Sequence, residues 1–76
     1  MKREFCVVDD VREDDFTLKN TKEEKYRIDR SLLGDFRCGD EVLLIYTERH
    51  ENEDGTFSAD VQSIFPDSSV LLRPAN

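Results

Sequence analysis

The chain has 76 residues, a net charge of −7 and a charged fraction of 38%. This length supports one domain with a single small core, which we assign to residues 1–76. The acidic balance argues against nucleic-acid binding, because phosphate contacts require a basic excess, and no apolar run is long enough to cross a membrane. The first residues lack the apolar stretch of a secretory leader, so we expect a cytoplasmic protein.

The first half of the chain predicts three short strands, at residues 4–11, 16–19 and 26–28. The first strand has apolar residues on both faces, with one set formed by Phe5, Val7 and Val11 and the other by Cys6 and Val8. A bulge near Asp9 would restore the alternation toward Val11. Residues 30–34 predict one short helical turn that Ser31 caps and Gly34 ends.

The second half predicts a strong strand at residues 42–49 and a further strand at residues 56–65. Asp54-Gly55 lies between them and is typical of a tight hairpin turn, because glycine tolerates a positive φ. The step from Val61 to Ile64 again breaks the alternation. A last short strand is expected at residues 70–72. We expect the core to include Phe16, Tyr26, Leu44 and Val61.

Five or six short strands with turn signals every 8 to 12 residues are typical of a small all-β barrel or rolled sheet. With one helical turn between the third and fourth strands, the pattern fits an OB-like or an SH3-like barrel. The segments 39–42 and 54–61 resemble the core pattern of Tudor-type SH3 barrels. The resemblance concerns the fold alone, because residues 70–74 stand where a Tudor domain has its cage aromatics.

No catalytic, nucleotide or metal signature is present, so we expect a non-enzymatic protein without metal or cofactor. His50, the only histidine, is expected at a solvated hairpin tip. An EF-hand register with Gly55 at the sixth position fails, because His50 and Val61 would occupy positions that require acidic ligands. Cys6 and Cys38 have no metal-ligand spacing and are expected as free thiols.

The charge is unevenly distributed along the chain. Residues 19–30 hold five basic and three acidic residues, a net of +2, between two acidic stretches. Lys19, Lys25 and Arg27 are expected to point outward on the second and third strands, the face on which OB-folds bind oligonucleotides. Stacking aromatics are missing there, so a single-stranded nucleic-acid-binding protein is the alternative interpretation, not the first.

The run Val42-Leu43-Leu44-Ile45-Tyr46 is apolar on both faces. A strand that meets water on one side normally alternates, so Leu43 and Ile45 are expected on an outer apolar patch. We assign Cys6, Val8 and Leu71 to the same patch.

An exposed patch of this kind usually marks a protein contact. We therefore expect a binding module that acts through protein–protein contact, with a larger partner or by self-association. A third hypothesis, an acidic mimic that occupies a basic nucleic-acid site on another protein, has only the net charge in its support.

Overall fold

The computed structural model describes residues 1–67, which form a closed five-stranded barrel. The strands are β1 (Lys2–Val11), β2 (Asp15–Asn20), β3 (Lys25–Asp29), β4 (Glu41–Glu51) and β5 (Phe57–Pro66). One 3₁₀ turn, η1 (Arg30–Leu32), lies between β3 and β4. The all-β class, the small barrel and the single helical turn are thereby confirmed. The strand expected at residues 70–72 lies outside the described residues.

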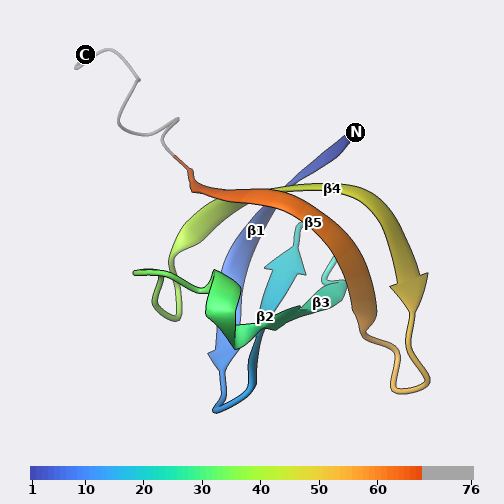
Figure 1. Cartoon of the computed structure of the whole chain (residues 1–76), viewed down its shortest axis with the longest axis horizontal. Helices are drawn as coiled ribbons and strands as arrows, with labels where there is room; N and C mark the ends of the chain where they lie inside the picture. The colour runs from blue at the N-terminus through green and yellow to red at the C-terminus, as the bar shows by residue number, and fades with distance from the viewer. Residues whose placement is uncertain (68–76) are drawn as a thin grey trace.

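The strand order around the barrel is β1-β2-β3-β5-β4. All neighbouring strands are antiparallel except β3 and β5, which pair in parallel at Tyr26 and Phe57. In a simple meander β4 would lie beside β3, whereas here β5 lies between them (Figure 1). This crossing is the Greek-key arrangement of an OB-like barrel and not the sequential order expected of an SH3-like one.

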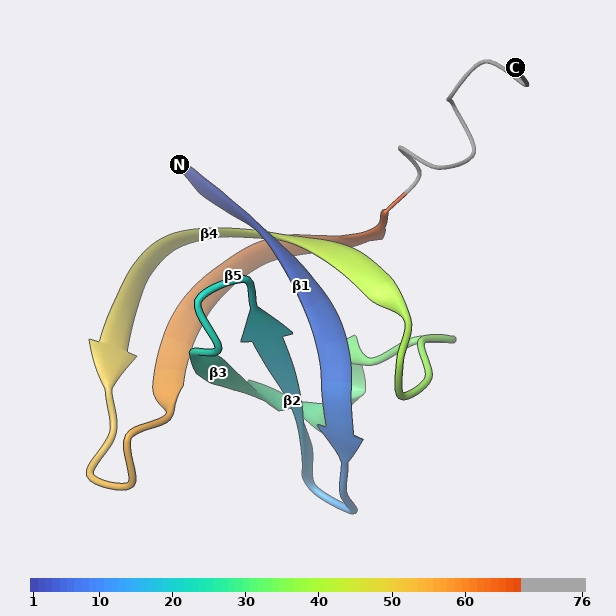
Figure 2. The same ribbon diagram turned by 180° about the vertical axis from the view of Figure 1, so that it is seen from behind.

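Figure 2 shows β1 crossing β4, and the strand order of the closed barrel places β4 between β1 and β5. The β4–β5 hairpin curves around the barrel and projects its loop beyond the other strands. Gly55 has a φ of 88° in that loop, as the Asp-Gly pair predicts. The loop is longer than a two-residue turn, because Asn52 N donates to Thr56 O at 2.7 Å.

The barrel interior is filled by aromatic and aliphatic side chains. Phe16, Tyr26 and Leu44 are fully buried, as predicted, and Val61 is half-buried against them. Of the two leucines of the helical turn, Leu33 is buried and packs into the core, whereas Leu32 is 45% exposed. Asp29, and not Ser31, caps that turn, since its carboxylate accepts from Ser31 N at 2.8 Å.

The strand register shifts at three places; two are at breaks in the sequence alternation, and the third, between Tyr46 and Arg49 of β4, is one that the sequence pattern did not indicate. The β1–β2 register shifts between Val8 and Asp10, as predicted. The β4–β5 register shifts where Ile45 pairs with Ser63 but Tyr46 pairs with Val61, which leaves Gln62 as the extra residue. Within residues 1–67 no helix is long and apolar enough to cross a membrane.

Candidate functional site

An apolar row crosses the outer face of three neighbouring strands. Phe5 of β1 pairs with Leu43 of β4, and Leu43 pairs with Phe65 of β5. Phe5 is 56% exposed and Phe65 is 50% exposed, while Leu43 between them is half-buried. Because adjacent strands lie about 4.8 Å apart, the row extends for roughly 10 Å. We call these three side chains the Phe5 row.

Leu43 and Ile45 lie on the outer face, because their neighbours Val42, Leu44 and Tyr46 all point into the core. Ile45 pairs with Arg3 and is half-buried. The apolar run of β4 therefore supplies both the interior of the barrel and part of its outer surface.

The assignment of Cys6 and Val8 to the outer patch is wrong. Cys6 is 4% exposed and Val8 is 1% exposed, and both belong to the core. Their strand neighbours Phe5 and Val7 point outward instead, and Val7 is 38% exposed. A small barrel alternates large and small side chains in its interior, and the small Cys6 and Val8 fill the space that the core aromatics leave. Leu71, the remaining patch residue, lies outside the described residues.

Burial also explains the chemistry of the first cysteine. Burial, with the nearby Glu4 charge, raises the pKa of the Cys6 thiol to about 12. Cys38 is exposed, and both are free thiols. Cys6 is therefore an apolar core side chain and not a nucleophile at neutral pH.

The basic residues of the alternative nucleic-acid face are largely engaged by acids. Lys25 Nζ lies 3.2 Å from an Asp9 carboxylate oxygen. Arg27 lies 3.6 Å from Asp15 through Nε and 2.5 Å from Asp54 through a terminal nitrogen. Lys19 pairs across the sheet with Lys25, and it has no ion pair with any residue of the described part of the chain. Two of the three predicted phosphate ligands are thus neutralised within the protein.

Unpaired cations gather instead around Phe5. Lys2, Arg3 and Lys22 line, with Phe5, a hollow of about 560 Å³ at one end of the barrel. Phe5 also borders a second hollow of about 290 Å³ that Lys19 lines. None of these four cations forms an ion pair with another side chain in residues 1–67. Glu4 and Glu24 also line the larger hollow, so this end of the barrel carries a local excess of cations over carboxylates beside an exposed aromatic ring.

A polar network closes the barrel beneath the larger hollow. Glu4 accepts hydrogen bonds from the hydroxyls of Tyr26 and Tyr46 through one oxygen, and from Asn20 Nδ2 at 2.6 Å through the other. Arg49 donates to the Tyr26 hydroxyl at 2.9 Å and to Glu24 at 3.1 Å. The polar side-chain atoms of Tyr26, Tyr46 and Asn20 therefore each have a hydrogen-bond partner, as burial in a low-dielectric interior requires.

The network shifts the proton affinity of its members. Burial raises the pKa of Glu4, but the hydrogen bonds from Tyr26, Tyr46 and Asn20 outweigh burial and hold that pKa below its ordinary value. Burial and the bond to Glu4 raise the pKa of Tyr26, so its hydroxyl remains a donor. The Glu4 carboxylate therefore has a structural role, because both of its oxygens already accept hydrogen bonds from side chains of the protein.

The sequence did not single out the Phe5 row, and of the cations around it only Lys19 was named as a candidate. Phe5 could have been found from the two-sided pattern of the first strand, which contains Phe5 and Val7 as one of its two faces. Only the pairing of β1 with β4 brings Phe5 beside Leu43.

No known protein family, no curated protein and no solved structure matches this chain. The site is therefore interpreted from its own geometry.

Proposed function

We propose that this protein is a non-enzymatic cytoplasmic binding module whose Phe5 row receives an apolar segment of a partner protein. The observation that carries the proposal is the alignment of Phe5, Leu43 and Phe65 across three paired strands, with both phenylalanines at least half exposed. Exposed apolar side chains are common singly, but a contiguous row on a small domain is typical of a contact surface.

The charge around the row indicates the chemistry of the partner. Lys2, Arg3 and Lys22 are unpaired with described residues and lie at the Phe5 end of the row. A partner segment with an apolar anchor and flanking acidic residues would complement both features. Self-association is less favourable, because each copy carries a net charge of −7 and like charges repel.

The expected affinity is modest. Covering the exposed parts of Phe5, Leu43 and Phe65 contributes roughly 3–5 kcal/mol before the cost of association. The surrounding cations add to the rate and specificity of binding more than to its strength. We therefore expect a transient contact that weakens as salt increases.

The test uses site-specific photo-crosslinking in a native lysate. A benzophenone amino acid replaces Phe5 in one protein and Leu32 in a control, since Leu32 is similarly exposed but lies on η1, outside the Phe5 row. We expect one protein to be captured at position 5 and not at position 32. The captured protein is then titrated against purified wild type, Phe5→Asp, Phe65→Asp and Leu32→Asp.

Binding should be lost in the two phenylalanine variants and retained in Leu32→Asp. Equal capture at both positions, or unchanged binding of folded Phe5→Asp, would contradict the proposal. Light scattering over a concentration series tests whether a second copy of this protein, and not a different partner, binds the Phe5 row. A dimer that Leu43→Glu abolishes would make the Phe5 row a self-association surface instead.

A further inference from the structure

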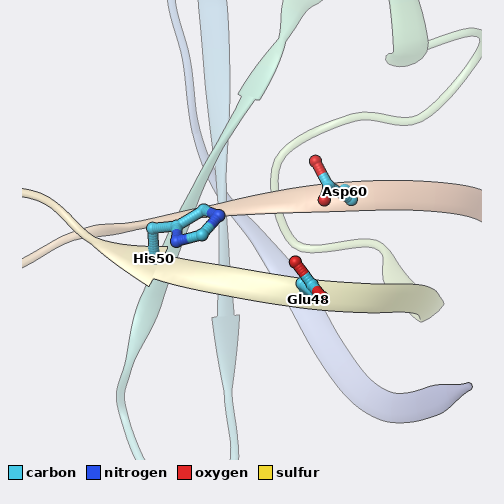
Figure 3. Close-up of side chains that lie close together, drawn as sticks. All are labelled: Glu48, His50 and Asp60. Carbon is cyan, nitrogen blue, oxygen red and sulfur yellow. The ribbon is translucent and has the colours of Figure 1, made fainter.

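The β4–β5 hairpin carries three metal-binding side chains on one face, Glu48, His50 and Asp60 (Figure 3). Glu48 and His50 are two residues apart in β4, so they point to the same side of the strand. His50 of β4 pairs with Ser58 of β5. Asp60 is two residues beyond Ser58 in β5, so the two side chains point to the same face of the sheet. His50 is exposed, as expected, but it lies within β4, which continues to Glu51, and not at the hairpin tip.

The donor atoms are close enough to share one ion. An imidazole nitrogen and one oxygen from each carboxylate all lie within 4.8 Å of one another. In a tetrahedral site, ligand atoms about 2.1 Å from the ion lie about 3.4 Å apart, so side-chain rotations that move the donor atoms by roughly 1.5 Å close the site. All three side chains are exposed and free to make that adjustment, while the pairing of Arg49 with Ala59 and of His50 with Ser58 holds the two strands together beside them.

The local charge lacks compensation. Across residues 1–67, no ion pair or hydrogen bond engages the side chain of Glu48, His50 or Asp60. Arg49 lies between Glu48 and His50 in sequence but is directed to the other face, where its guanidinium carbon is 4.2 Å from the centre of the Phe57 ring. Two neighbouring carboxylates without a cation repel each other, and a divalent ion would remove that repulsion.

We propose that Glu48, His50 and Asp60 form a surface site for a divalent transition-metal ion of the zinc class. An imidazole beside two carboxylates matches zinc, whereas calcium takes six to eight oxygen ligands. Three protein ligands leave the remaining coordination positions to water. The site lies beyond the Phe5 row along β4 and does not depend on the proposed function.

The decisive measurement is NMR of the His50 ring, which is unambiguous because the chain has one histidine. Untagged full-length protein with Cys38→Ser is titrated with zinc chloride, since Cys38 is an exposed thiol that could bind zinc itself. We expect the ring signals to shift with one zinc bound per chain by calorimetry. Calcium chloride should leave the ring signals unchanged.

Variants in the same background locate the ion. His50→Gln, Glu48→Gln and Asp60→Asn should each weaken zinc binding by at least about ten-fold, the scale on which lost ligand support acts. Glu53→Gln, which removes a charge from the same hairpin outside the cluster, should change affinity by less than about two-fold. Unshifted ring signals at saturating zinc, or equal loss of affinity in Glu53→Gln, would overturn the site.

Discussion

At the residue scale, Glu4 joins more parts of the barrel than any single apolar contact does. It lies on β1 and accepts hydrogen bonds from β2, β3 and β4 through Asn20, Tyr26 and Tyr46. Hydrogen bonds to a charged acceptor are stronger than neutral ones and are costly to break when partly buried. Glu4 therefore pins the register of the strands that meet at this end of the barrel.

Replacing Glu4 with Gln should destabilise the protein in a pH-dependent way. The folded state holds the pKa of Glu4 below its ordinary value of 4.5, so the charged form stabilises the fold above that value. This contribution is lost as the pH falls through the lowered pKa, because both states then bind the proton. Urea unfolding should show a large difference between wild type and Glu4→Gln at about pH 7 and a smaller one at about pH 4, below the ordinary pKa of 4.5.

The matched control for this experiment is Glu53→Gln, an exposed loop residue that should lower stability little at either pH. A difference between wild type and Glu4→Gln that stays constant with pH would contradict the stabilising role of the Glu4 charge.

At the element scale, β1 and β4 have apolar residues on both faces, and the fold uses the two faces differently. The inner face of β4 contributes Val42 and Leu44 to the core, both fully buried, while its outer face contributes Leu43 to the Phe5 row. Strands with both faces apolar have an ambiguous orientation until a partner strand is chosen. Pairing β4 between β1 and β5 resolves that ambiguity.

Truncating Leu44 to Ala should cost about 2–5 kcal/mol of unfolding free energy, because it leaves a cavity in a core that cannot collapse around it. The total unfolding free energy of a domain of this size is only a few kcal/mol larger than this loss. Chemical denaturation measures the loss. Leu32→Ala, at a 45% exposed position, is the control and should change stability by under about 0.5 kcal/mol. Similar losses in the two variants would contradict the burial that the structure shows.

At the scale of the whole molecule, the charge layout separates two surfaces. The outer side of β2 and β3 is covered by ion pairs, among them Lys25 with Asp9 and Arg27 with Asp54. The end of the barrel near Phe5 keeps cations that are unpaired with described residues. The average charge of −7 therefore conceals a local excess of cations beside the apolar row.

Single-stranded DNA or RNA should not bind to the wild-type protein at physiological salt, because acidic side chains already occupy Lys25 and Arg27. Fluorescence anisotropy with a labelled oligonucleotide tests this expectation. A triple variant, Asp9→Asn, Asp15→Asn and Asp54→Asn, releases both cations and should bind weakly at low salt. A micromolar, salt-sensitive complex of the wild type, lost when Lys19, Lys25 and Arg27 become Glu, would instead favour the nucleic-acid function.

The sequence by itself determined the five strands of the described residues, the bulge near Asp9 and the single helical turn. These features depend on local physics: a side-chain period of two, the positive φ of Gly55, and the break in alternation at Val8 to Val11. It also determined that the side chains of Leu43 and Leu44 would point to opposite faces, since successive residues of a strand do so.

Only the tertiary structure decided which apolar face of β1 turned inward, because Cys6 and Phe5 are equally consistent with the alternation. The choice depends on the space left by side chains from other strands, which no local pattern contains. The pairing of Arg27 with Asp54 and the meeting of Glu48 with Asp60 also join residues far apart in sequence. The β1–β4 pairing that closes the barrel brings Phe5 beside Leu43, and the β4–β5 hairpin brings Glu48 beside Asp60, so both proposed sites were decided by strand pairing.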